Sequence, residues 1–180
     1  MRTAEQRRDP LLGEWACLGI LYDRPAHGWA IVKRLRPDGD IGRVWHLSRP
    51  LTYRALDQLT TRGWIHAVAE EPGHAGPHRT ILAATRVGRA RFRTWVRTPV
   101  PHLRDLRSEL LLKLVFAERH DIDIAQMLDR QREIIDEHAR ALADRSDTDP
   151  APDHDVVTLW RTEATLAARR FLDQIHPTTG

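Results

Sequence analysis

Residues 48–54 combine hydroxyl and guanidinium side chains at the expected start of a helix. Ser48 is a good helix cap, and Pro50 fits the first helical turn. The free backbone N–H groups at such a start favour anions, and the side chains beside them can donate hydrogen bonds to phosphates or base edges. We therefore expect contacts to a nucleic acid from Ser48, Arg49, Thr52, Tyr53 and Arg54. The alternative is an ordinary surface helix that carries arginine.

A second basic group follows a loop, residues 71–77, that is rich in glycine and proline. His78 and Arg79 lie where a hairpin tip would reach a minor groove or a phosphate backbone. The alternative is a metal site, since His74 and His78 are four residues apart. That spacing suits a helix, but a Gly-Pro pair lies between them and no cysteine or suitable carboxylate completes the shell, so no metal is expected. The glutamates at 70–71 would repel phosphate, which leaves the tip and the second strand for contact.

The elements around these residues predict a winged helix-turn-helix. Apolar residues at helical spacing and short apolar runs alternate in the order helix, helix, helix, strand, loop, strand, helix. The expected helices are residues 9–22, 27–36, 48–63 and 85–97, and the expected strands are residues 64–69 and 80–84. In such a fold the third helix enters the major groove. The predicted class is mainly α with a small β-hairpin wing.

A proline-containing linker, residues 99–102, separates this part from a second one of different composition. Helical patterns without strand signals cover residues 103–119, 124–143 and 156–175. We expect a winged DNA-binding domain over 1–98 and a C-terminal helical dimerisation domain over 103–180. Three amphipathic helices do not easily hide all their apolar faces alone, which favours a homodimer. The alternative is a monomer whose helices fold back on the winged domain.

The charge of the chain is unevenly distributed along its length. Residues 1–102 hold 17 Lys/Arg and 9 Asp/Glu, a net +8, whereas residues 103–180 hold 11 and 16, a net −5. This asymmetry indicates that only the first part meets a polyanion, here double-stranded DNA. The alternative is chance clustering on a solvated surface.

Catalysis, cofactors and membrane insertion are not expected. The chain has no Gly-rich phosphate loop, no His-Glu-x-x-His and no Gly-x-Ser-x-Gly motif. Cys17, the single cysteine, excludes a disulfide framework and lies in an apolar pattern that favours a core residue over a nucleophile. The first ten residues carry both charge signs and do not resemble a signal peptide, and no apolar stretch is long enough to span a bilayer. A soluble cytoplasmic protein is therefore expected.

Several of these segments together resemble the PadR family of transcriptional regulators. They are His27-Gly28-Trp29, Ser48–Leu56 with Gly63-Trp64-Ile65, Gly76–Arg79, and Thr85–Arg89. Residues 109–116 resemble the helical domain of the longer, virulence-activator-like branch of that family. The sequence departs from the family at Thr80-Ile81-Leu82, where Lys-Tyr-Tyr is common, and this change removes one cation from the wing.

The resemblance implies a homodimeric regulator, expected to be a repressor, on a pseudo-palindromic operator. Ser48, Thr52 and Tyr53 match the DNA-facing stretch of the family, and His78 and Arg79 match its basic wing. Family members often respond to small aromatic or drug-like effectors, for which tryptophan rings could line a pocket. The tryptophans considered are Trp15, Trp29, Trp45, Trp95 and Trp160, of which Trp15, Trp29 and Trp95 are also expected in the core. The alternative function is a winged-helix protein-interaction module that does not bind DNA.

Overall fold

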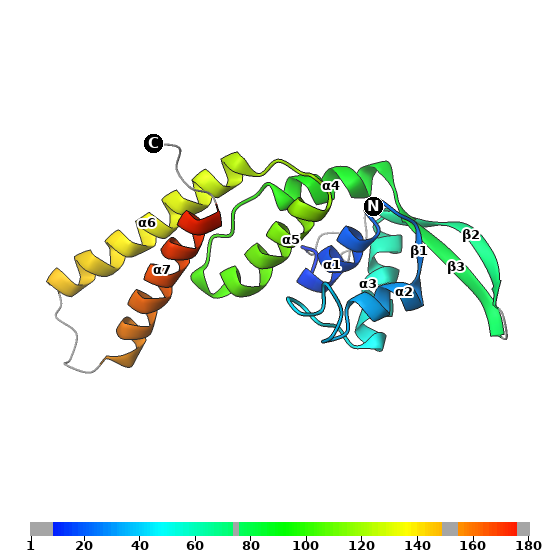
Figure 1. Ribbon diagram of the computed structural model, residues 1–180, viewed down its shortest axis with the longest axis horizontal. Coiled ribbons are helices and arrows are strands. Elements are labelled where there is room, and N and C mark those ends of the chain that lie inside the picture. The colour runs from blue at the N-terminus through cyan, green and yellow to red at the C-terminus, as the bar shows by residue number, and fades with distance from the viewer. Residues whose placement is uncertain (1–8, 74–75, 149–154, 176–180) are drawn as a thin grey trace, which may run out of the picture. The chain divides into compact units, whose positions relative to one another are not determined.

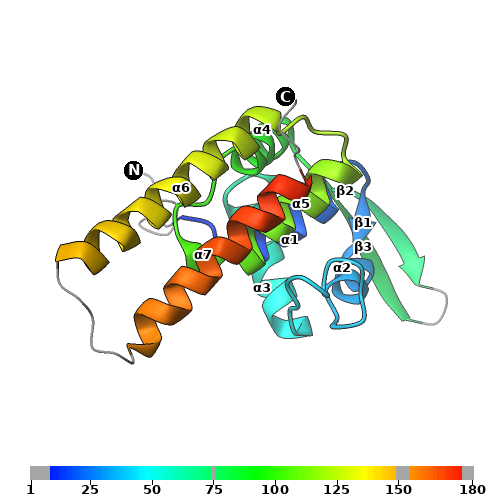
Figure 2. The ribbon, with the colours of Figure 1, turned by 60° about the vertical axis from the view of Figure 1, so that its left-hand side comes forward.

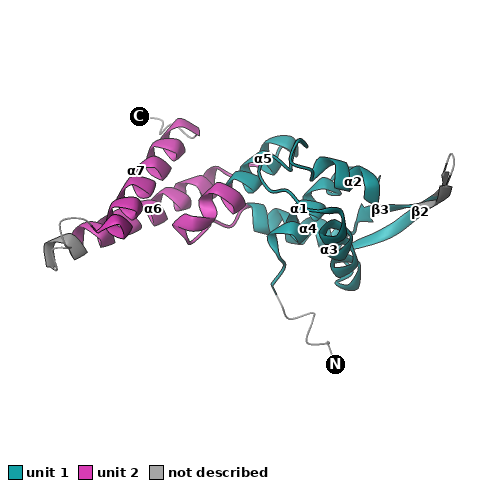
Figure 3. Ribbon diagram, turned by 90° about the horizontal axis from the view of Figure 1, so that it is seen from below, with its two compact units in different colours: residues 1–96, 111–122 teal, residues 97–110, 123–180 magenta. Residues whose placement is uncertain are grey.

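The computed structural model describes residues 9–73, 76–148 and 155–175. Its elements form two compact units (Figure 3). Unit 1 consists of the residues up to Val96 together with Leu111–Ile122, and unit 2 consists of Arg97–Leu110 and the residues from Asp123 onward. No helix within the described residues is long and apolar enough to cross a membrane.

Unit 1 is a winged helix-turn-helix with one additional helix (Figure 1). Its helices are α1 (Leu12–Ile20), α2 (Gly28–Arg34), α3 (Arg49–Thr61), α4 (Arg86–Val96) and α5 (Leu111–Arg119), and its strands are β1 (Ala26–His27), β2 (Ile65–Gly73) and β3 (Gly76–Ala84). The strands pair antiparallel in the order β1-β3-β2. The prediction of a mainly helical fold with a small β wing is confirmed.

Three predicted helix boundary signals are found where the sequence indicates them. The Ser48 hydroxyl accepts a hydrogen bond from the backbone of Leu51 at the start of α3. The Thr85 hydroxyl accepts one from the backbone N–H of Gly88 at the start of α4, at 3.0 Å. Gly63 follows α3 with φ of +69°, the left-handed conformation that glycine adopts readily.

The wing is longer than the sequence predicts. Residues 71–77 were expected to be a loop, but β2 extends to Gly73 and β3 begins at Gly76. Pro72 is tolerated because it lies in an irregular step of the ladder on an edge strand, where no hydrogen bond from its nitrogen is required. The short strand β1 was not predicted, since two residues give no periodicity.

Helix α5, predicted to belong to the helical domain, instead packs within unit 1. A Cβ on Gly19 would lie 2.5 Å from the Phe116 ring, so this glycine allows α5 to approach α1 closely. Phe116 also meets Phe92 edge-on, with ring centroids 5.4 Å apart, and the buried ring of His120 donates from Nε2 to the Gly19 carbonyl at 2.9 Å. The predicted domain boundary differs from the observed units because apolar periodicity does not identify the partner against which a helix packs.

A small ion-pair cluster also joins α5 to the segment after α2. The Asp40 carboxylate accepts hydrogen bonds from Arg34, at 2.8 Å, and from Arg119, at 2.5 Å. Partial burial of Asp40 acts to raise the pKa of its carboxyl, but the hydrogen bond from Arg34 and the charges of both arginines outweigh it. The pKa of Asp40 is therefore held below its ordinary value of 3.8.

Unit 2 is built on two long helices, α6 (Ala125–Thr148) and α7 (Val156–Ile175), preceded by a 3-10 turn (Leu103–Asp105) and a π-helical turn (Leu106–Leu110). The predicted linker is fixed to α6. The buried Gln131 side chain accepts from the Val100 nitrogen at 2.7 Å and donates to the Val100 oxygen at 2.9 Å. Residues 99–102 are therefore part of this unit.

Helix α7 leaves much of its apolar surface exposed. Thr165 and Leu172 are buried, and Arg132 of α6 donates to the Leu172 carbonyl at 3.1 Å. The exposed apolar side chains of α7 are Val156, Val157, Leu159, Trp160, Leu166 and Ile175. Trp160 is 71% exposed, which is unusual for so large an apolar side chain.

Candidate nucleic-acid interface

The first turn of α3 presents its residues to solvent. Ser48, Arg49, Pro50 and Leu51 are all exposed. The Ser48 hydroxyl oxygen caps the helix, so its hydrogen stays available as a donor. The exposed helix start adds the positive end of the helix dipole. This turn can therefore receive an anionic group such as a phosphate.

Arg49 lies between two aromatic rings, one from each helix of the helix-turn-helix. Its guanidinium carbon is 5.8 Å from the ring centroid of Trp29 in α2 and 5.8 Å from that of Tyr53 in α3. Trp29 is 42% exposed and Tyr53 is 38% exposed. We call these three residues the arginine–aromatic cluster. Contact with ring faces orients a guanidinium while leaving its N–H edge free to donate.

Gly28 allows this cluster to form. A Cβ at this position would lie 2.8 Å from Cε1 of Tyr53. The preceding residue, His27, caps α2, since its Nδ1 accepts from the Ala30 nitrogen at 3.1 Å. The His27-Gly28-Trp29 segment thus starts α2, gives room to the Tyr53 ring and supplies a ring for Arg49. The sequence predicts Trp29 in the core. That prediction is wrong, because Trp29 is exposed.

The burial of Thr52 and Leu51 differs from what their residue types suggest. Thr52 is fully buried, and its hydroxyl donates to the Ser48 carbonyl at 3.0 Å, so it does not reach a DNA-facing surface. Leu51, an apolar residue one position earlier, is 51% exposed. The buried side of α3 is formed by Thr52, Ala55, Leu56 and Leu59. Leu51 replaces Thr52 in the candidate surface, where an apolar side chain can contact a thymine methyl group.

The positive charge of this surface is not neutralised by carboxylates of the described residues. Arg49 and Arg54 are exposed, and neither forms an ion pair with a carboxylate of the described residues. Asp57, also exposed, lies one turn further along α3. The cationic character is therefore confined to the amino-terminal half of the helix.

The wing supplies the second part of the interface. His78 and Arg79 belong to β3, and Arg79 is the ladder partner of Glu71. The side chains of His78 and Arg79, and His74 as a whole, lie outside the described part of the chain. The roles of His78 and Arg79 stay predictions.

Cys17 and Trp95 lie in the core of unit 1, and Trp15 is half-buried. Cys17 is fully buried, and burial raises the pKa of its thiol, as expected for a core residue and not for a nucleophile. Trp15 and Trp95 stack on each other with centroids 5.0 Å apart, so one face of each ring is already in contact within the protein. Within the described residues, no group of three or more His, Cys, Asp or Glu side chains could hold a metal ion.

Three solved structures are similar to this chain. Bacillus subtilis PadR in complex with operator DNA has a TM-score of 0.46 and 17% identity, with 90% of this chain and 96% of that chain covered. The smu.1604c protein of Streptococcus mutans has a TM-score of 0.46 and 18% identity, with 92% of this chain and 98% of that chain covered. A PadR-like transcriptional regulator from Bacillus cereus has a TM-score of 0.39 and 21% identity, with 91% of this chain and 94% of that chain covered. No protein-family model and no curated protein matches the chain.

Proposed function

We propose that this protein is a DNA-binding transcriptional regulator of the PadR family that acts as a homodimer on a pseudo-palindromic operator. The observation that carries the proposal is the arginine–aromatic cluster at the start of α3, beside the exposed Arg54 and followed by a β wing. Guanidinium groups oriented by aromatic rings at an exposed helix start, with no carboxylate partner among the described residues, are suited to receive an anion.

In the proposed complex the amino-terminal half of α3 enters the major groove. Arg49 donates to guanine or to a phosphate, Tyr53 donates its hydroxyl, and Leu51 contacts a thymine methyl group. Ser48 and Arg54 contact the phosphate backbone on either side. His78 and Arg79 of the wing follow the minor groove, as the sequence predicts.

The exposed face of α7 supports the dimer. Trp160, Leu159 and Val156 lie within about one helical turn of each other and are each more than 60% exposed. Covering such a face with a second copy would bury them. Two winged units about 34 Å apart would then match successive major-groove faces of the operator.

Repression follows when the bound dimer occupies a promoter. An effector that changes the spacing of the two recognition helices would release it. The small aromatic effector stays a prediction that binding measurements with the intact protein must test.

The test is binding to duplex DNA from the protein's own upstream region, at two salt concentrations and with competitor DNA. We expect competitor-resistant binding whose affinity falls steeply with salt, because phosphate contacts release counterions. Absence of binding at low salt contradicts the proposal.

The second candidate is a protein-interaction module that does not bind DNA. The specific observation in its favour is that the aromatic side chains of Trp29 and Tyr53 are exposed on α2 and α3, and aromatic side chains are enriched at protein interfaces. A partner-binding constant that is insensitive to salt, together with absence of DNA binding, would favour this alternative.

A further inference from the structure

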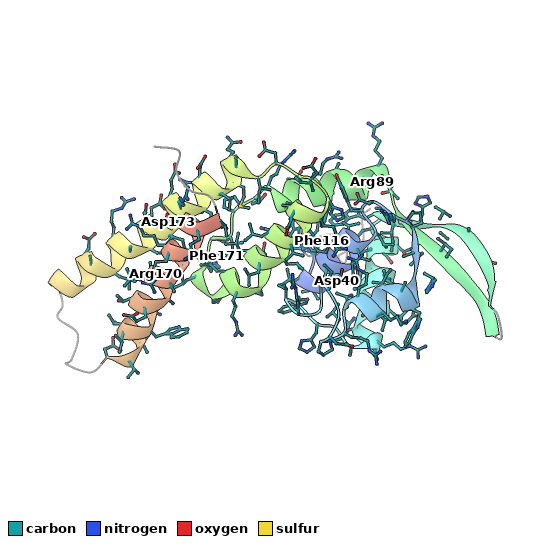
Figure 4. All side chains as sticks on the ribbon, viewed as in Figure 1. Asp40, Arg89, Phe116, Arg170, Phe171 and Asp173 are labelled. Atoms are coloured by element: carbon teal, nitrogen blue, oxygen red, sulfur yellow. The ribbon has the colours of Figure 1, made fainter. Side chains whose placement is uncertain are left out.

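A surface pocket of about 380 Å³ lies in unit 1 between β2, the end of β3 and the first turns of α4. It is lined by His66, Ala84, Thr85, Arg86, Arg89 and Arg93. We call it the arginine pocket. Figure 4 places Arg89 at the end of α4 that follows β3. The proposed function uses none of these residues.

The close approach of α4 to β2 builds the pocket. The Thr85 nitrogen donates to the Trp64 carbonyl at 2.8 Å, and the Thr85 hydroxyl holds the Gly88 nitrogen. A Cβ on Gly88 would lie 2.1 Å from the Trp64 oxygen, so only glycine permits this contact. These contacts hold the start of α4 against Trp64. Because Trp64 lies two residues before His66, the start of α4 is also close to His66 of β2.

The helical spacing directs three arginines toward the same side of α4. Arg86, Arg89 and Arg93 are three and four residues apart, which places them on neighbouring turns of one face. Arg89 is half-buried and its Nε donates to the Ala84 carbonyl at 3.4 Å, while Arg93 donates to the Tyr22 hydroxyl at 3.3 Å. These partners are neutral and orient the guanidinium groups without compensating their charge.

The pocket therefore concentrates positive charge. None of the three arginines forms an ion pair with a carboxylate in the part of the chain that the structure describes. Like charges at this spacing repel each other, and an anion in the pocket would remove that repulsion. Guanidinium groups bind phosphate oxygens through paired N–H donors, which gives both charge and geometric selectivity.

We propose that the arginine pocket binds the phosphate group of a small phosphorylated molecule. Its volume falls within the range of small-molecule sites, about 300–1,000 Å³. Helix α4 lies across unit 1 from the amino-terminal end of α3 in both views (Figures 1 and 2), so a duplex held by α3 would not occupy the pocket. The proposal does not rest on DNA binding.

The experiment titrates the full-length protein with inorganic phosphate, and separately with glycerol 3-phosphate, at constant ionic strength. The readout is the imidazole NMR resonance of His66, which lines the pocket. The pocket variants are Arg86→Gln and the double variant Arg86→Gln/Arg89→Gln. The matched control is Arg91→Gln, which removes an exposed arginine of the same helix that does not line the pocket.

We expect a saturable shift in the wild type and in the control, and at least a tenfold weaker response in the double variant. The phosphate affinity of the single variant Arg86→Gln should lie between those of the wild type and the double variant. Because the Arg86 side chain is exposed, its replacement should not unfold the protein, so a weaker response in this variant reports the loss of the pocket charge. Tighter binding of glycerol 3-phosphate than of inorganic phosphate identifies an organic phosphate as the ligand, and the reverse order identifies free phosphate.

Two outcomes would overturn the proposal. One is the absence of saturation in the wild type. Another is an equal response in all variants, which indicates a general salt effect on the protein. If the wild type shows no saturation and the double variant also loses affinity for duplex DNA, these arginines contact the DNA backbone instead.

Discussion

Replacing Arg49 by alanine is expected to weaken operator binding while leaving the fold and the oligomeric state nearly unchanged. The side chain is exposed and is held only by the rings of Trp29 and Tyr53, each 5.8 Å from its guanidinium carbon. Its removal leaves no cavity in the core and no buried charge. The substitution therefore separates recognition from stability.

The structure sets the size of both effects. An exposed cation–π contact contributes about 0.5–1 kcal/mol, so the loss of one such contact in Arg49→Ala should lower Tm by only about 1–4 °C. A lost bidentate contact to a base removes about 1–3 kcal/mol of binding energy, or about 5- to 150-fold in affinity. If Arg49 contacts a phosphate instead, the slope of log affinity against log salt should fall by about 1.

Fluorescence anisotropy with the upstream duplex, at several salt concentrations, measures affinity and slope together. Tyr53→Phe keeps the ring beside Arg49 and removes only the hydroxyl, so we expect a smaller loss of about 0.5–1.5 kcal/mol. Arg91→Ala, an exposed position on α4, controls for loss of one positive charge. Unchanged affinity in both Arg49→Ala and Tyr53→Phe would remove α3 from the DNA-facing surface.

Four further predictions test the fold and the assembly. Gly28→Ala should displace the Tyr53 ring and reduce DNA affinity several-fold with little change in Tm, since a Cβ would lie 2.8 Å from that ring; equal affinity would show that the ring position is unimportant. Trp160→Glu should weaken the dimer at least tenfold in light-scattering measurements, whereas Arg161→Glu, exposed on the same helix, should not. Glu14→Ala should destabilise unit 1 by up to about 3–5 kcal/mol in urea unfolding, because it removes the ion pair, 3.4 Å long, between Glu14 and the largely buried Arg62 side chain. For Asp40, whose pKa is lowered in the fold, the stability advantage of wild type over Asp40→Asn should be fully present above the ordinary value of 3.8 and decline as the pH falls below it; a pH-independent difference would contradict the ion-pair explanation.

The order of elements and most helix starts could be predicted from the sequence because their causes are local. Ser48 and Thr85 cap helices through their own side chains, and Gly63 adopts the left-handed conformation that its lack of a Cβ permits. None of these features depends on a distant part of the chain. Short-range chemistry therefore predicted the winged fold and the position of α3.

The errors within the candidate surface have a different cause. Thr52 can be buried because its hydroxyl is satisfied by the Ser48 carbonyl, so the polar residue type did not indicate exposure. Trp29 fits the apolar pattern of α2 but is exposed, with its ring under the Arg49 guanidinium of α3. Contacts of this kind are set by tertiary packing, and the apolar pattern of a single helix does not reveal them. The same reason explains the misplaced α5, whose partner Gly19 lies almost a hundred residues earlier.

The insertion of α5 into unit 1 imposes an order on folding during synthesis. The chain passes between the two units three times, after Val96, Leu110 and Ile122. A nascent chain that ends at Val96 has the complete wing and recognition helix but lacks the Phe116 ring that covers Gly19 and Phe92. The winged unit should thus become protease-resistant only after residue 122 has left the ribosome. A fragment cut at the proline segment would expose an aromatic surface and aggregate, whereas a shortened protein that retains residues 111–122 would not.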